Sequence, residues 1–538
     1  MERICEKDEE KQFVLLKSLS QRNHQKKVGS LGSNEIKREI IRYFSMNKIQ
    51  RWYLWTALLC AVFSIASCMN DDEFTTDAGA LLTFEADTVK FDTVFTTIGS
   101  STKRFKVFNT NKKGVRCQSV ALESGGANGF RINVDGHSGA LLTDIEIPGK
   151  DSIFIFAEVT LNPQSSDTPV LVRDKILFTL ENGRQQQLVL QAYGQDIIVL
   201  RAEEVTADRI LTGVRPYLIY DSLVVKEGAT LTIDAGTTLC FHDKAYLGVH
   251  GTVVSNGTQE KPVIFRGDRI DRMFTNLPYD FMDAQWGGVT LHPESTNNLF
   301  THTDIHSGTY GIACQPSTTT EKKLTLESCI IHNVSGHGLM LHSCIVEARN
   351  SQITNAGGDC IHIVGGNHDF VHCTIAQFQL WHSGSGTALS ITNTEDKKDY
   401  PLDAANFYNC LITGWSNDEI IIVKSKQEDV ALNYFFKNSL INIKMTGSES
   451  DEVKARFVDC FNESNLKGED VVKGEKNFQE RATYQFNFNL SEQSNARGIG
   501  SNEYVTLCPI DLNGVERPTE KPDAGCFQFR SDETIPKE

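Results

Sequence analysis

Two aspartates and one histidine in the second half of the chain are the residues best suited to acid–base chemistry. Asp359 follows a pair of glycines, Asp369 lies ten positions further on, and His337 stands between two glycines. Two carboxylates can supply the acid and the base of glycoside hydrolysis, and a histidine can move a proton near neutral pH. The glycines can equally serve to turn the chain between strands, which is the interpretation that we favour. Asp359, Asp369 and His337 are therefore the candidates for catalysis in a chain that we do not expect to be an enzyme.

A second group of residues is suited to binding a sugar. Trp381 and Trp415 each follow a short repeating unit, with His382 beside the first and Asp418 and Glu419 just after the second. An aromatic ring with polar neighbours can stack on the apolar face of a sugar while the polar groups hold its hydroxyls. The alternative is that the two tryptophans fasten an inserted loop. Trp381, Trp415 and His382 are the predicted ligand-binding residues.

Histidine is concentrated in one part of the chain, where nine of the 14 lie between His302 and His382. His306 and His332 have the same position in the repeating unit, so we expect them to point outwards as neighbours. Such a pair can bridge a transition metal. Ordinary exposed polar residues explain the pair more simply, so the sequence predicts no metal site and no cofactor.

The repeating unit indicates which elements position these side chains. It reads Thr, Ser or Cys, then a variable residue, then Ile, and it begins at Thr303, Cys329, Ser351, Cys373, Cys410 and Ser439. The steps between successive units are 26, 22, 22, 37 and 29 residues. Buried and variable residues alternate, which is the period of a strand with one buried side. A repeat this short cannot bury its own apolar face and must stack on its neighbours.

Two more short apolar runs accompany each unit, so a repeat of roughly 22 residues holds three strands. Repeats made of helical pairs need about 33 residues or more, whereas this length fits one rung of a right-handed parallel β-helix. We expect about 8–10 rungs, with equivalent residues stacked in columns about 4.8 Å apart. The 37-residue step predicts a charged insertion of about 15 residues within 383–403, leaving the coil at one corner.

Several segments resemble known β-helix proteins. Residues 224–237 (VVKEGATLTIDAGT) and Trp286-Gly287-Gly288 resemble the opening rungs of bacterial β-helix proteins of the pectate-lyase-like superfamily. The segments around Asp359 and His337 resemble active-site segments of polygalacturonase-type glycosidases, but the second aspartate and the Arg-x-Lys are missing and the order is reversed. The resemblance implies an all-β protein, with an N-terminal β-sandwich followed by a single-stranded right-handed parallel β-helix.

The N-terminal region reads as a secretory signal. A cationic segment at 46–51 precedes the apolar stretch Trp52–Ile65, whose 14 residues are too few to span a bilayer core of about 30 Å. The following Ile65-Ala66-Ser67-Cys68 resembles the lipobox of bacterial outer-membrane lipoproteins. The expected parts are an over-extended start at 1–45, a lipoprotein signal peptide at 46–67, and Cys68 as the acylated residue that anchors the protein in outer-membrane lipid.

The remainder divides into three parts and a tether. Residues 79–196 hold short alternating strands and the hairpin signal Asn182-Gly183, which predicts a β-sandwich. This part resembles the immunoglobulin-like domains that precede β-helices in envelope lipoproteins. The expected boundaries are an acidic tether at 68–78, the sandwich at 79–196, the β-helix at 205–442, and a C-terminal segment at 443–538 that packs on or caps the β-helix.

Charge and cysteine content narrow the possible partners. From Cys68 onwards the chain has 41 basic and 62 acidic residues, a net charge of −21, and no basic patch, which argues against a nucleic-acid partner. Twelve cysteines remain there without a CxxC pair, so we expect mostly buried free thiols.

The function that we expect is non-catalytic binding of an extended polysaccharide or host glycan by a cell-surface outer-membrane lipoprotein. The alternatives are a divergent polysaccharide-degrading hydrolase or lyase, and a purely structural envelope protein. An enzyme predicts a pair of acids on one flank of the β-helix, a binding protein predicts exposed aromatic rings without such a pair, and a structural protein predicts an exposed apolar patch.

Overall fold

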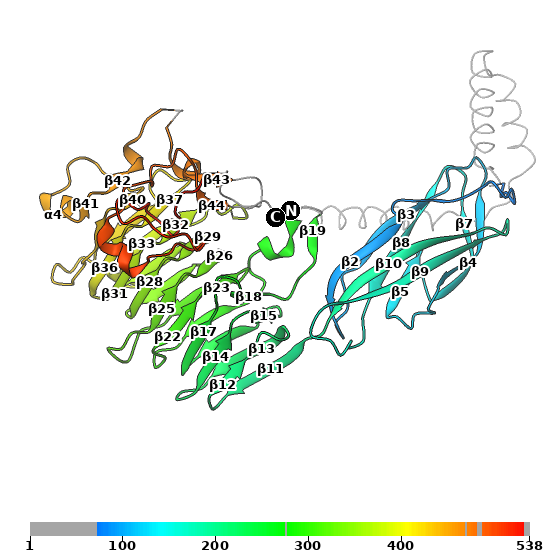
Figure 1. Ribbon diagram of the computed structural model, residues 1–538, viewed down its shortest axis with the longest axis horizontal. Helices are drawn as coiled ribbons and strands as arrows, with labels where there is room; N and C mark the ends of the chain where they lie inside the picture. The colour runs from blue at the N-terminus through cyan, green and yellow to red at the C-terminus, as the bar shows by residue number, and fades with distance from the viewer. Residues whose placement is uncertain (1–72, 275–276, 383, 469–470, 481–486, 532–538) are drawn as a thin grey trace, which may run out of the picture. The chain divides into compact units, whose positions relative to one another are not determined.

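The computed structural model describes residues 73–274, 277–382, 384–468, 471–480 and 487–531. The predicted signal peptide, the anchoring Cys68 and the first part of the acidic tether lie outside the described residues. No helix in the described part of the chain is long and apolar enough to cross a membrane. Among the described residues, strands account for nearly all of the regular structure, as expected for an all-β protein (Figure 1).

Residues 83–195 form a β-sandwich of two five-stranded sheets. One sheet has the order β1–β3–β8–β5–β6 and the other the order β2–β10–β9–β4–β7. The hairpin between β9 and β10 turns at Asn182-Gly183, as the sequence predicts. The strands are β1 (Thr83–Phe84), β2 (Thr88–Phe95), β3 (Lys103–Phe108), β4 (Val115–Leu122), β5 (Phe130–Val134), β6 (His137–Ser138), β7 (Leu141–Ile147), β8 (Ser152–Val159), β9 (Val170–Leu180) and β10 (Gln185–Gln195).

The alternation within β8 explains why this segment forms a strand of a sandwich. Ile153, Ile155 and Val159 are buried in the core between the two sheets, whereas Phe154 and Phe156 on the opposite side are exposed. Side chains alternate across a strand, so every second residue of β8 contributes to one core.

From residue 198 onwards, parallel strands wind into a β-helix with three faces, which we name A, B and C (Figure 1). Face A is the ten-stranded sheet of β12 (Arg209–Leu211), β14 (Thr230–Asp234), β17 (Thr252–Asn256), β22 (Asn298–Thr301), β25 (Leu324–Glu327), β28 (Ile345–Arg349), β31 (Gly366–Val371), β36 (Leu402–Tyr408), β39 (Phe435–Lys437) and β41 (Phe457–Val458).

Faces B and C belong to one 18-stranded sheet and diverge from β13 (Tyr217–Val225), which pairs with β11 (Ile198–Val205). Face B continues through β15 (Thr238–Phe241), β18 (Val263–Gly267), β23 (Thr303–His306), β26 (Ile330–Val334), β29 (Gln352–Ala356), β32 (Thr374–Gln377), β37 (Leu411–Gly414), β40 (Leu440–Ile441) and β42 (Phe461–Asn462). Face C continues through β16 (Tyr246–Val249), β21 (Gly288–Leu291), β24 (Ile312–Cys314), β27 (Leu339–His342), β30 (Ile361–Val364), β33 (Leu389–Thr392) and β38 (Ile420–Val423).

Each rung runs from face A to face B to face C, and the parallel pairing continues past residue 442 to β42. The bend between faces A and B is made by a single residue with positive φ, between 40° and 54° in the rungs that carry the repeating unit. These residues are His302, Ser328, Asn350, His372, Asn409 and Asn438. One left-handed residue turns the chain sharply, and short polar side chains are among those that adopt this conformation most easily. The repeating unit begins directly after this bend.

The interior of the β-helix consists of stacked columns, as the sequence predicts. The first residue of each repeating unit is buried, and so is its Ile. Face A supplies an aromatic column of Phe370, Phe407, Phe436 and Phe457, with ring centroids 4.8, 4.8 and 5.1 Å apart and nearly parallel planes. All 11 cysteines in the described part of the chain are free, and all but Cys460 are buried. The predicted buried thiols are therefore confirmed.

Two insertions leave the coil at the corner between faces B and C. One lies between β18 and β21 and contains β19 (Arg272–Phe274), β20 (Leu277–Pro278) and η1 (Tyr279–Phe281); the other is the segment between β32 and β33. We call them the first and second insertions. The sequence predicts one charged insertion within 383–403. The structure instead divides those residues between the second insertion and a hairpin of β34 (Thr394–Glu395) and β35 (Lys398–Asp399) at the corner between faces C and A.

The C-terminal segment packs on the outward side of face B. Its Phe488, Leu512 and Phe527 share an apolar cluster with Leu411 and Leu440 of β37 and β40. The remaining elements are α4 (Asp451–Lys454), η2 (Glu463–Asn465), η3 (Gly474–Asn477), β43 (Phe478–Glu480), β44 (Asn487–Leu490) and η4 (Asn502–Leu507).

Candidate functional site

The two aspartates proposed for acid–base chemistry do not meet. Asp359 lies in the turn between β29 and β30, at the corner between faces B and C. Asp369 lies in β31 on face A, where Asn406 Nδ2 donates a hydrogen bond to its Oδ1 at 2.8 Å. Residues ten apart fall on different faces because the coil turns a corner between them. Asp359 and Asp369 therefore cannot act together as the acid and base of one site.

Asp359 instead meets two histidines. His362 Nδ1 is 2.9 Å from Asp359 Oδ2, and the backbone N–H of Asp359 donates to His337 Nδ1 at 2.9 Å. Thr387 donates to Asp359 Oδ1 from its backbone N–H at 2.9 Å and from its hydroxyl at 3.1 Å. The sequence analysis missed His362 and Thr387, although His362 lies only three residues after Asp359.

The contacts fix the protonation of this cluster. Burial raises the pKa of Asp359, but hydrogen bonds from His362 and Thr387 outweigh burial and hold the pKa below its usual value. Burial lowers the pKa of His362, but the hydrogen bond and charge of Asp359 reverse this and raise it. The pKa of His337 is lowered by burial and by the nearby His362. The arrangement is thus an Asp359–His362 ion pair beside a neutral His337.

A second carboxylate approaches the same cluster from the hairpin. Glu395 Oε1 is 3.6 Å from His362 Nε2, and Glu395 Oε2 is 3.5 Å from His342 Nε2. His362 therefore lies between two carboxylates, Asp359 and Glu395. A histidine in this position can exchange a proton with a ligand only by giving up one of these partners.

His306 and His332 are neighbours in register, as the sequence predicts, with ring centroids 4.9 Å apart. The structure adds two carboxylates. Asp304 Oδ1 is 2.8 Å from His306 Nδ1 and 3.3 Å from His332 Nε2, and Asp280 Oδ1 is 3.2 Å from His306 Nε2. The expectation that both histidines are ordinary exposed residues is wrong for His306, which is buried because η1 of the first insertion covers it.

Trp381 fastens the two insertions to each other. Its Nε1 donates to the carbonyl oxygen of Phe281 at 3.1 Å, and the ring is half-buried. The adjacent His382 Nε2 lies 2.7 Å from Asp283 Oδ2 in the first insertion. Both side chains are held by contacts within the protein, which favours the alternative that Trp381 and His382 fasten a loop.

Trp415 is in a different environment. Its ring is 52% exposed, and one wall of a hollow of about 480 Å³ is formed by Trp415 together with Asn442 and Lys473. The buried Phe378 meets the ring edge-on at 5.9 Å and so fixes its orientation. About half of the Trp415 side chain is thus open to a ligand, and the contact with Phe378 holds the ring in place.

Asn442 gives this hollow an unsatisfied polar group. The residue is only 3% exposed, and its Nδ2 donates to the carbonyl oxygen of Ser416 at 2.9 Å. Its Oδ1 accepts no hydrogen bond from the described residues. Buried polar atoms are almost always paired, so this oxygen would gain a hydrogen bond if the side chain turned toward a ligand hydroxyl or a water in the hollow.

Glu419, which the sequence placed beside Trp415 as a polar neighbour, does not face a ligand. It is 1% exposed, and its oxygens accept the backbone N–H groups of Ser416 at 2.6 Å and Ala388 at 2.9 Å. Burial raises its pKa to about 7, although the two hydrogen bonds oppose the shift. Glu419 therefore holds the corner between successive rungs.

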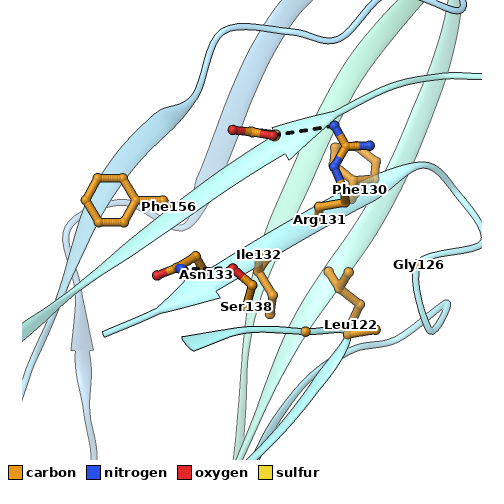
Figure 2. Close-up of a pocket in the computed structure, with 11 residues that line it drawn as sticks. Leu122, Gly126, Phe130, Arg131, Ile132, Asn133, Ser138 and Phe156 are labelled. Atoms are coloured by element: carbon orange, nitrogen blue, oxygen red, sulfur yellow. Dashed lines mark hydrogen bonds and ion pairs between the residues drawn. The ribbon is translucent and has the colours of Figure 1, made fainter. Parts of the chain in front are cut away.

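A further hollow, of about 470 Å³, lies on the β-sandwich. Figure 2 shows Phe156, Arg131 and Asn133 around it, from β5 and β8. Arg131 pairs with Glu158 at 3.4 Å, and Asn133 Nδ2 donates to Ser138 Oγ at 2.9 Å. Its polar side chains are thus satisfied by one another, unlike Asn442 of the β-helix.

Comparisons with known proteins agree with the fold of the second part. Residues 217–375 match the family model described as "Right handed beta helix region". No curated protein matches. The family match covers less than a third of the chain.

Three solved structures are similar at low identity. A family 123 glycoside hydrolase from Clostridium perfringens is 10% identical over 21% of this chain and 25% of its own length, with a TM-score of 0.15. The ASH/PapD-like domain of human CEP192 is 7% identical over 21% of this chain and 85% of that domain, with a TM-score of 0.15. The catalytic unit of a GH87 α-1,3-glucanase from Streptomyces thermodiastaticus is 8% identical over 67% of this chain and 88% of that catalytic unit, with a TM-score of 0.14.

This chain thus covers only a quarter of the first of these structures, and TM-scores this low do not establish a shared overall structure. The family match and the parallel pairing of its strands together identify the second part of the chain as a right-handed parallel β-helix.

Proposed function

We propose that the protein binds an extended polysaccharide or host glycan, without cleaving it, in the hollow beside Trp415. One observation carries the proposal: Trp415, which is 52% exposed, and Asn442, whose buried Oδ1 accepts no hydrogen bond from the described residues, line the same hollow. A sugar ring offers an apolar face of C–H groups and an edge of hydroxyls. The first suits stacking on an indole, and the second suits donation to a buried carbonyl oxygen.

Other groups around the hollow suit the same ligand. Lys473 Nζ donates to Asn417 Oδ1 at 3.1 Å, and among the described residues this is its one hydrogen bond, so its other two donors can bind sugar oxygens. Gly414 and Ser416 add backbone groups to the wall. A few well-placed polar groups around an aromatic platform are typical of small-molecule sites.

The lining favours binding over hydrolysis. Among the described residues that line the hollow, Glu475 is the single carboxylate, whereas glycoside hydrolysis needs two on opposite sides of the scissile bond. Glu419 is close in sequence but both of its oxygens accept backbone N–H groups. A ligand in this hollow would meet an aromatic platform without an acid pair.

We further propose that the protein is an outer-membrane lipoprotein at the cell surface, anchored in lipid through an acylated Cys68, with an immunoglobulin-like sandwich between anchor and β-helix. The lipobox-like sequence before Cys68 supports this location. Cys68→Ser should abolish incorporation of a radiolabelled fatty acid and release the protein from membranes, while Cys117→Ser, a buried cysteine of the sandwich, should not. Labelling that persists in Cys68→Ser would refute the anchor.

The ligand proposal is tested with a panel of soluble polysaccharides, neutral and uronic, together with a glycan array. Depletion of the protein by a polysaccharide measures binding, and new reducing ends or absorbance of unsaturated products measure cleavage. Binding without new ends is the expected result. New ends that depend on Asp359 or His337 would overturn the non-catalytic proposal.

Catalysis is the second candidate, and the Asp359–His362 pair is the observation that favours it. His362 is held by a carboxylate at Nδ1 and approached by Glu395 at Nε2, an arrangement that can serve a general acid, because the paired imidazolium has a proton to give. In this case His362→Gln should abolish product formation, while Trp415→Ala should lower it only through weaker substrate binding.

A further inference from the structure

A cluster with the donor set of a transition-metal site lies on the outward side of face B. It consists of Asp304 and His306 on β23 and His332 on β26, and one ligand atom from each lies within 4.8 Å of the others. Tetrahedral zinc holds nitrogen and oxygen ligands roughly 3.3–3.5 Å apart, given bonds of about 2.0–2.2 Å. The 3.3 Å between Asp304 Oδ1 and His332 Nε2 already meets this requirement. The 2.8 Å between Asp304 Oδ1 and His306 Nδ1 must widen by about half an ångström.

The surroundings of His306 resemble the support that proteins give to a metal-binding imidazole. Its second nitrogen, Nε2, faces Asp280 Oδ1 at 3.2 Å, and Arg266 NH2 in turn contacts the same carboxylate oxygen at 2.6 Å. A carboxylate at the far nitrogen holds a proton there and fixes the orientation of a ligand histidine. Nδ1 of His306 faces Asp304 Oδ1 at 2.8 Å, so a bound metal would replace the proton of that contact and take both atoms as ligands. Asp280 and Arg266 would thus act on the metal through His306.

The second histidine cluster offers a control because it has the same residue types, but one of its ring nitrogens already accepts a backbone hydrogen bond. His337, Asp359 and His362 also lie within metal-binding reach of one another. However, the backbone N–H of Asp359 donates to His337 Nδ1, so this nitrogen is already an acceptor and the proton of the neutral ring is on Nε2. A metal at either nitrogen of His337 would have to break that hydrogen bond or remove that proton.

The first cluster also has access to solvent. Asp304 lines a hollow of about 440 Å³ between face B and the C-terminal segment, with Gln352 and Asn489 in its wall. A site with three protein ligands keeps a fourth position for water or another oxygen ligand. The side chains of Asp304 and His332 are 28% and 22% exposed, so solvent reaches these two ligands.

We propose that Asp304, His306 and His332 bind one first-row divalent transition metal, Zn²⁺ by their donor set, and that the ion fastens the first insertion to face B through Asp280. Two imidazoles and a carboxylate suit such ions, whereas Mg²⁺ and Ca²⁺ prefer oxygen ligands alone. The binding is independent of the polysaccharide proposed for the Trp415 hollow, which lies on a later rung.

The test is a titration of the chelator-treated, purified protein with Zn²⁺ by calorimetry and with Co²⁺ by visible absorption. We expect one ion per chain that His332→Gln removes, whereas His337→Gln and His362→Gln retain it. Asp280→Asn should weaken affinity about 10–100-fold while keeping the Co²⁺ spectrum, because it removes support for a ligand and not the ligand itself. Zn²⁺ should also raise the Tm of the wild type but not that of His332→Gln.

The baseline is the double variant His306→Gln/His332→Gln, which reports any metal held by cysteines or by the termini. His332 is partly exposed, so His332→Gln is expected to fold, and circular dichroism checks this. Wild-type binding no greater than that of the double variant overturns the proposal. Loss of the ion in His362→Gln with retention in His332→Gln also overturns it, and places the site at the second cluster.

Discussion

The indole nitrogen of Trp381 donates a hydrogen bond to the carbonyl oxygen of Phe281, 3.1 Å away and a hundred residues earlier in the chain. This contact joins the second insertion to the first. It also separates the two tryptophans that the sequence put forward together, since Trp381 is engaged by the protein and Trp415 is about half exposed. The first prediction rests on this difference.

Trp381→Ala should loosen both insertions and leave polysaccharide binding nearly unchanged. It removes a half-buried ring and a hydrogen bond of about 1 kcal/mol, so limited proteolysis should cut within 268–287 and 378–388 sooner than in the wild type. Trp381→Phe, which keeps most of the packing, should show a smaller change. Lost binding with an unchanged cleavage pattern would mean that Trp381 contacts the ligand.

The aromatic column of face A should be a main source of β-helix stability. Phe407 stacks between Phe370 and Phe436 at 4.8 Å on each side and is fully buried. Phe407→Ala should therefore lower the free energy of unfolding of the β-helix by about 3–5 kcal/mol. Leu141→Ala, at a 63% exposed position of the sandwich, should change stability by less than about 0.5 kcal/mol. Chemical denaturation followed by circular dichroism distinguishes the two, and equal effects would contradict the column's role.

The bend between faces A and B gives a prediction about backbone conformation. Asn350 has a φ of 50°, and its side chain accepts a hydrogen bond from Arg517 NH2 at 2.7 Å. Asn350→Gly loses the side chain, and glycine adopts the left-handed conformation without strain. Asn350→Ala loses the same side-chain contacts, and its Cβ in this conformation also destabilises the folded state by about 1–2 kcal/mol. We expect Asn350→Ala to be the less stable of the two by that amount in thermal unfolding. The reverse order would show that the bend imposes no strain.

The sequence predicts the local features of the fold well. The alternation within each repeating unit predicts which residues enter the interior, because strand geometry alone decides it. β5 and β8 of the sandwich alternate for the same reason. The alternation is less regular in β2. Its Asp92 has a φ of 57°, and this bulge interrupts the alternation that marks a strand.

The candidate sites could be predicted only in part, because they depend on where the insertions go. The register of His306 and His332 follows from the repeat, but nothing periodic indicates that Asp280, 26 residues before His306, returns to contact it. Likewise, the unpartnered Oδ1 of Asn442 depends on how the chain beyond face B is packed. Asp359 and Asp369 are only ten residues apart in sequence, which suggests that they are neighbours. The coil turns a corner between them, so they lie on different sides of the β-helix.

Glu419 predicts a specific dependence of stability on pH. Burial raises its pKa to about 7 in the folded protein, whereas an unfolded glutamate has its model value of 4.5. Between these values the folded state holds a proton that the unfolded state has lost, so this group's contribution to stability falls as pH rises through 7. Glu419→Gln removes the titration, and its stability relative to the wild type should improve by about 3 kcal/mol between pH 4.5 and pH 8.

The control for this effect is Glu428→Gln, at an exposed position of the neighbouring loop, which should show the same difference from the wild type at both pH values. Denaturation midpoints of the three proteins at pH 4.5, 6 and 8 provide the comparison. A difference between Glu419→Gln and the wild type that does not change with pH would mean that Glu419 is ionised throughout, held by the N–H groups of Ser416 and Ala388.

The most direct test of the account compares the affinities of three variants with that of the wild type, for the polysaccharide that the wild type binds best. We predict that Trp415→Ala lowers affinity by about tenfold or more, that Trp415→Phe retains most of it, and that no reducing ends appear. Tyr193→Ala, at an exposed aromatic position of the sandwich, should bind as the wild type does. Unchanged affinity in Trp415→Ala, or cleavage of the bound polysaccharide, would contradict binding without catalysis at this hollow.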